Sequence, residues 1–269
     1  MADNVFSAAY RCLVEPDADR KVALAAALEG DWREGRLAVD RDVALPAVAE
    51  AGRPERPVLV EARGLSSRGA GSAEGRAALV HAVAHIEFNA INLACDAVYR
   101  FREMPEAFLG DWIRVAAEEA RHFGLLRDRL RELGHDYGDF PAHRGLWDMA
   151  QRTAGDVLAR MALVPRVLEA RGLDVTPGIM ARLRRAGDDR TADLLAIILR
   201  DEIGHVAAGT RWFRYLCEGR GLEPEAEYFR LLDQFLRGEL RCPLHLDARR
   251  QAGFSDAELA RLQAMCEGT

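Results

Sequence analysis

Cysteine is scarce in this sequence, and the cysteines that occur are poorly spaced for a thiolate metal site. Five cysteines are spread over 269 residues, and no two of them form a Cys-x-x-Cys pair. A zinc ribbon or a rubredoxin-type iron centre needs paired thiolates, so this spacing argues against both. Because the cysteines are odd in number and far apart, we expect a reducing compartment, the cytoplasm.

Long apolar runs and basic stretches are missing as well. No apolar run is predicted to be long enough to cross a bilayer, and the first residues do not show the charged and then apolar segments of a signal peptide. The formal net charge is −6, and no stretch is basic enough to suggest a nucleic-acid contact. We therefore expect neither a membrane nor a nucleic-acid partner.

Aromatic residues make up only 7% of the chain, and runs of β-branched residues are few. Alanine, leucine, arginine and glutamate are abundant instead, and this balance favours helices. The chain is long enough to form one good-sized core. These features predict an all-α protein.

Apolar periodicity and capping signals predict where the helices lie. Pro16 separates two short N-terminal helices, and Asp17 or Asp19 is expected to cap the second. An irregular connector follows over 36–73, with a Ser/Gly-rich stretch at 64–72. Long helices are expected over 73–102, 105–133, 146–171 and 189–218, with shorter ones over 177–186, 224–240 and 256–266.

Four acidic positions on apolar helical stripes form the most informative pattern. Two are lone glutamates, and each of the other two begins a Glu-x-x-His pair. A lone glutamate precedes a pair by 32 residues in the first half of the chain and by 33 in the second. Two lone glutamates and two such pairs, each on its own helix, are the ligand set of a di-iron carboxylate site in a four-helix bundle. The predicted metal ligands are Glu87, Glu119, His122, Glu169, Glu202 and His205.

The residue types suit this chemistry. Carboxylate and imidazole ligands favour two iron ions, and a manganese or mixed iron–manganese pair also fits. Residues three apart lie on one helix face, so each Glu-x-x-His pair presents both groups to one centre. Two divalent cations would neutralise four carboxylates that are costly to bury alone. The predicted organisation is a bundle over 73–240, a helical extension and arm over 1–72, and a helical tail over 241–269 packed on the bundle, together one structural domain.

A third Glu-x-x-His, formed by Glu132 and His135, is interpreted as a helix end rather than a metal site. Gly134 and the turn residues that follow are typical of a helix C-terminus, where a histidine also interacts well with the helix dipole. No further acid completes a ligand set around this pair. We expect it to bind no metal.

Residues next to the ligands have predicted supporting roles. Metal-bound histidines usually donate their second N–H to a carboxylate or carbonyl, and each pair has an acid four residues before its histidine: Glu118 for His122 and Asp201 for His205. The alternative is that both acids are merely solvated. His81 and His85 are expected to have structural or supporting roles rather than to bind metal. Pro165, one turn before Glu169, either aims that carboxylate or only accommodates packing.

Four stretches carry a resemblance to a known group of proteins. They are HAVAHIEFNAINLACDAVYRF (81–101), EEARHF (118–123), RMALVPRVLEARGLDV (160–175) and RDEIGHVA (200–207). Over about residues 75 to 265 the chain resembles an uncharacterised bacterial group of ferritin-like proteins. This resemblance implies a ferritin-like bundle with a di-iron site on the six ligands. More distantly, the pattern is similar to the tRNA isopentenyl-adenosine hydroxylase, another ferritin-like di-iron enzyme. Rubrerythrins share the ligand set, but this chain lacks their cysteine-rich module.

Three functions are compatible with this pattern. The first is a non-haem di-iron oxygenase or oxidase that uses dioxygen or peroxide to oxidise a small-molecule substrate. It would need an external electron donor, because the sequence has no flavin, nicotinamide or Cys₄ signature. The second is iron handling, by ferroxidation, storage or peroxide detoxification. The third is a non-catalytic helical protein with a structural dimetal site.

Overall fold

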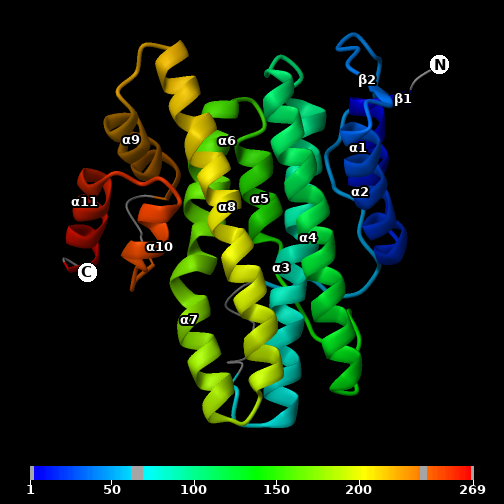
Figure 1. The fold of residues 1–269 in the computed structure, drawn as a ribbon, viewed down its shortest axis with the longest axis vertical. Coiled ribbons are helices and arrows are strands. Elements are labelled where there is room, and N and C mark those ends of the chain that lie inside the picture. Colours follow the sequence, from blue (N-terminus) through cyan, green and yellow to red (C-terminus); the bar gives the residue numbers. More distant parts are fainter. Residues whose placement is uncertain (1–2, 62–68, 237–240, 268–269) are drawn as a thin grey trace. The chain divides into compact units, whose positions relative to one another are not determined.

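The computed structural model describes residues 3–61, 69–236 and 241–267. Helices make up most of this part of the chain (Figure 1). Its only strands are β1 (Asp3–Asn4) and β2 (Leu37–Ala38), which form a short parallel pair. The prediction of an all-α protein is therefore confirmed.

The chain folds as two compact units, Met1–Gln151 and Arg152–Thr269, and each is described by itself. The predicted division into 1–72, 73–240 and 241–269 stays a prediction. The helices of the first unit are α1 (Val5–Val14), α2 (Ala18–Arg33), α3 (Ala73–Arg100), α4 (Glu106–Glu132) and α5 (Gly145–Arg152), the last of which ends at the boundary.

Local signals position the helices of the first unit. The side chain of Asp17 accepts a hydrogen bond from the backbone N of Arg20 at 2.9 Å and caps α2, as predicted. Ser72 caps α3 in the same way, and Pro105 precedes the first residue of α4. Most of the predicted 64–72 stretch lies outside the described residues.

A buried lysine ties the N-terminal helices to α3. Lys21 is fully buried, and its Nζ donates to the backbone oxygens of Cys12 at 2.7 Å and Leu13 at 3.1 Å, at the end of α1. The same ammonium donates to Oδ1 of Asn92 on α3 at 2.6 Å. A buried charge is tolerable only when it is fully hydrogen-bonded, so these three acceptors fix α1 and α2 against α3.

Helix α3 is long and apolar enough, by length and composition, to cross a membrane, which the sequence analysis did not anticipate. Its most apolar window has a mean hydropathy of 1.2, and 72% of that window is buried inside the protein. A core helix passes the same test. The burial of α3 against α1 and α4 accounts for its apolar character.

The second unit is built around one long helix, α8 (Asp189–Gly219), against which the neighbouring helices pack (Figure 1). The other helices are α6 (Val157–Leu163), the π-helix η2 (Val164–Glu169), α7 (Ala170–Arg185), α9 (Pro224–Leu236), α10 (Leu246–Gln251) and α11 (Asp256–Glu267). The predictions for 189–218 and 256–266 are confirmed, and the last residues of the helix predicted over 224–240 lie outside the described part.

The predicted single helix over 146–171 is wrong. The chain leaves the helix after Arg152, and the side chain of Asp156 caps a new one by accepting from the N of Leu158 at 3.0 Å. The predicted separate helix over 177–186 is wrong as well, because α7 continues through Pro177. Pro177 removes one backbone hydrogen bond, but buried residues before it (Leu173) and after it (Leu183) hold the helix in place.

One pair of cysteines forms a disulfide that the sequence did not predict. Cys242 and Cys266 are joined, with their Cα atoms 5.8 Å apart. Cys12, Cys95 and Cys217 are free and buried. The compartment stays a prediction.

Candidate metal centre

The first unit supplies three of the predicted ligands from two packed helices. Glu87 lies on the buried face of α3, and Glu119 and His122 lie three residues apart on the buried face of α4. The helices meet through an edge-to-face contact between Phe88 and Phe123, whose ring centroids are 5.4 Å apart. Each ring follows a ligand in sequence, so this contact sets the distance between the ligand-bearing turns.

The three side chains converge. Nδ1 of His122 lies 3.3 Å from Oε2 of Glu87 and 3.3 Å from Oε2 of Glu119. One ligand atom from each residue lies within 4.8 Å of the others, and all three residues are buried. Two carboxylates and an imidazole aimed at one point in a dry core form a group that can hold a metal ion.

The electrostatics of this group favour a cation. Burial disfavours a protonated ring, but hydrogen bonds to Glu119 and Glu87 outweigh burial and raise the pKa of His122 to about 10. In the metal-free chain the imidazolium therefore balances part of the negative charge of the carboxylates. A metal ion would take over that role and displace the proton, because a ligating imidazole is neutral.

The second unit supplies the other three predicted ligands. Glu202 and His205 lie on α8, and Nδ1 of His205 is 3.5 Å from Oε1 of Glu202. His205 is fully buried, and Glu202 is 9% exposed. Glu169 is 7% exposed and is the last residue of η2. Each unit thus holds two glutamates and one histidine of the predicted ligand set, all of them buried, and the convergence of the two sets on one centre stays a prediction.

The π-helix gives the predicted irregularity at Pro165 a definite form. Val164–Glu169 is wound as one π-helical turn between α6 and α7, with Pro165 near its start and Glu169 at its end. Proline cannot donate the backbone hydrogen bond that an α-helix needs, and π-turns are frequent at functional sites.

A glycine on α8 makes room for this turn. A Cβ atom added at Gly209 would lie 2.3 Å from Cγ and 2.4 Å from Cβ of Pro165. Only a residue without a side chain allows so close an approach. Gly209 and Pro165 lie far apart in the sequence, so no local pattern reveals that they approach each other.

The supporting roles predicted for Glu118 and Asp201 stay predictions. Both residues are half-buried, and Oδ1 of Asp201 is 3.1 Å from Nε of Arg200.

The two histidines of α3, His81 and His85, have structural partners, as predicted. His85 Nδ1 is 2.8 Å from the Tyr137 hydroxyl, and its Nε2 is 3.1 Å from the backbone oxygen of His143. Nε2 of His81 accepts from the N of Gly138 at 3.0 Å, and its ring stacks on Tyr137 with centroids 5.4 Å apart. Both rings fix the loop after α4 onto α3.

The third Glu-x-x-His lies at a helix end, as predicted. Glu132 is the last residue of α4, and Gly134 has a φ of +82°. The N of His135 donates to the backbone oxygen of Leu130 at 3.0 Å, a bond that closes the helix. Oε2 of Glu132 is 2.8 Å from Nη1 of Arg129, so this carboxylate is engaged in an ion pair.

These features define an all-α protein with a buried carboxylate–histidine group that can hold a metal ion. The chain belongs to the family described as "Protein of unknown function (DUF455)", whose model matches residues 14–260. It is 49% identical over 213 residues to an "Uncharacterized protein" of Haemophilus influenzae, an alignment that covers 77% of this chain and 74% of that protein. No solved structure matches the chain.

Proposed function

We propose that the protein is a ferritin-like dimetal oxidoreductase whose metal ligands come from both units. The observation that carries the proposal is the group in the first unit, where the His122 ring faces two buried carboxylates at 3.3 Å each. Two carboxylates and an imidazole held this close together in a buried core are oxygen and nitrogen ligands that suit a divalent metal ion.

The second unit repeats the composition of the first. Glu202 and His205 correspond to Glu119 and His122 in spacing, and Glu169 corresponds to Glu87 in order. Four carboxylates and two imidazoles complete the ligand set of a dimetal centre in a four-helix bundle, in which a lone glutamate and a Glu-x-x-His pair recur. In this proposal the helices α3, α4 and α8 and the segment α6–α7 form the bundle.

A bound pair of iron ions would supply redox chemistry with dioxygen or peroxide, directed at a small organic substrate and sustained by an external electron donor. A manganese or mixed pair would use the same ligands. The chain itself holds the ligand geometry and excludes water. The aromatic contact beside Glu87 and His122 keeps that part of the core dry.

Metal reconstitution tests this function. The full chain, freed of metal with a chelator, is titrated with Fe(II) under anaerobic conditions and then exposed to oxygen, with optical and Mössbauer spectra before and after. We expect two irons per chain and a spectrum of a coupled pair. The matched variants are Glu119→Ala, which should lose iron, and Glu132→Ala, which should not.

The outcomes separate the alternatives. Uptake that continues far beyond two irons, with a mineral core, would favour iron handling. Two irons that do not respond to oxygen or peroxide would favour a structural dimetal site. A chain that binds no iron, or a Glu119→Ala variant that binds it normally, refutes the site itself.

A further inference from the structure

Glu169 lies between two arginines that both reach the C-terminal segment of the second unit. Arg166, three residues earlier, belongs to η2, and Arg171, two residues later, lies in the first turn of α7. Nη2 of Arg166 is 2.5 Å from Oε1 of Glu258 on α11, in a pair that is almost completely buried. The π-turn that presents Glu169 is therefore attached to α11.

Aromatic rings enclose the guanidinium of Arg166. Its central carbon lies 4.1 Å from the ring centroid of Tyr228, 4.5 Å from that of Phe254 and 4.7 Å from that of Phe213. A carboxylate and three aromatic rings thus surround this buried cation and stabilise it. This attachment is stiff rather than a solvated surface contact.

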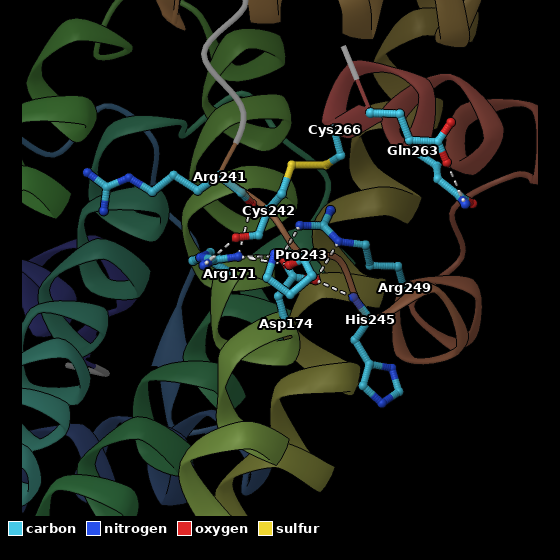
Figure 2. Close-up of a disulfide and its surroundings, with 10 residues drawn as sticks. Arg171, Asp174, Arg241, Cys242, Pro243, His245, Arg249, Gln263 and Cys266 are labelled. Atoms are coloured by element: carbon cyan, nitrogen blue, oxygen red, sulfur yellow. Dashed lines mark hydrogen bonds and ion pairs between the residues drawn. A yellow bond between two sulfur atoms is a disulfide. The ribbon is translucent and has the colours of Figure 1, made fainter. Parts of the chain in front are cut away.

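Arg171 makes the second attachment (Figure 2). Its Nη1 donates to the backbone oxygens of Arg241 at 2.9 Å and Pro243 at 3.0 Å, and its Nη2 donates to that of Cys242 at 3.4 Å. Three consecutive carbonyls are thus gathered on one guanidinium. The segment that carries Cys242 is held at the start of α7, directly after Glu169.

The disulfide joins the two attachments. Cys242 lies in the segment whose backbone oxygens Arg171 binds. Cys266 lies on α11, the helix that carries Glu258. Asp174 adds a further hold on α7 by accepting from Nε of Arg249 at 2.9 Å and from its Nη2 at 2.8 Å (Figure 2). The two cysteines are separated by 24 in sequence. The segment that they close contains Glu258, the partner of Arg166, and the backbone oxygens of Cys242 and Pro243 that Arg171 binds.

We propose that Arg166 and Arg171 are positioning residues for Glu169, and that the Cys242–Cys266 disulfide is a redox latch that keeps their acceptors in place. The inference rests on the proposed metal site and adds its regulation. Both cysteines are half-buried, so a reductant can reach the bond. Reduction by a dithiol breaks the one sulfur–sulfur bond: two electrons pass from the dithiol, two cysteine thiols form, and the reductant becomes a disulfide.

Metal affinity of the full chain in its two redox states tests the latch. Metal-free oxidised protein and protein reduced with dithiothreitol, both desalted without oxygen, are titrated with Co(II) and followed by visible absorption. Partners that orient a metal ligand are worth about 10–100-fold in affinity, so we expect reduction to weaken binding at least about tenfold. Arg171→Met, with the disulfide intact, should show a comparable loss.

Variants identify which cysteines act. Cys242→Ser with Cys266→Ser should bind as weakly as the reduced chain and no longer respond to dithiothreitol. Cys217→Ser keeps the disulfide and should respond as the wild type does. Hydrogen exchange of metal-free protein adds a readout without metal: amides of 164–170 should exchange faster after reduction, with those in the middle of α8 unchanged.

The failures are distinguishable. Equal Co(II) affinity and equal exchange in the two redox states overturn the latch while leaving the metal site standing. A response that persists in the double serine variant also overturns it, because another thiol would then be the cause. Oxidised wild type that binds no Co(II), or binds it equally well as Glu169→Ala, refutes the proposed site and the latch with it.

Discussion

Substitution of Gly209 by alanine tests the packing of α8 against the π-turn. The new Cβ would lie 2.3 Å from Cγ of Pro165, and a proline side chain cannot rotate away because its ring is closed onto the backbone nitrogen. Overpacking a dense core costs about 1–3 kcal/mol. Replacing a helical glycine by alanine also stabilises the helix, by about 1 kcal/mol. Since the proline ring cannot yield, we expect a net loss of about 1–2 kcal/mol in the free energy of unfolding.

Gly204 provides the matched control on the same helix. A Cβ there meets no atom within 4 Å, so Gly204→Ala should stabilise the chain by about 0.5–1 kcal/mol. Urea unfolding of metal-free protein, followed by circular dichroism, measures both variants. Opposite shifts of the two midpoints are expected. If Gly209→Ala stabilises the chain as much as Gly204→Ala does, the close approach of α8 to Pro165 is wrong.

Three further predictions concern the ligands and the neighbouring histidines. His205→Ala should lower the metal content measured by elemental analysis, whereas His135→Ala should not; equal losses would show that the Glu-x-x-His pairs were misread. Fe(II) or Mn(II) at a hundredfold excess over its dissociation constant should stabilise the native chain by about 2.7 kcal/mol, seen as a higher Tm than with chelator; an unchanged Tm in protein shown to be metal-free would contradict the site. Burial lowers the pKa of His85 from 6.5 to about 4. The neutral ring therefore contributes its full stability above pH 6.5. As the pH falls toward 4, the free energy of unfolding should decrease by about 3 kcal/mol. The urea midpoint of His85→Gln should fall less steeply with decreasing pH than that of the wild type. Equal pH dependence in both proteins would refute the assignment to His85.

The sequence by itself determined the helical class, the ligand types and most helix bounds. Helical stripes are local, so α3, α4 and α8 begin within a residue of where periodicity and capping predict them. The Glu-x-x-His spacing also decides locally that both groups share a helix face. The convergence of Glu87 with Glu119 and His122 was inferred from the motif, and the packing of α3 on α4 brings these side chains together.

Only the tertiary structure decided the irregular parts of the second unit. The continuation of α7 through Pro177 depends on which neighbours hold each turn, and helix propensity carries no information about those neighbours. The π-turn requires both Pro165 in its own segment and a glycine about 44 residues later that leaves room for it. The disulfide likewise depends on two distant segments meeting, because cysteine spacing does not reveal which pairs of thiols fold within bonding distance.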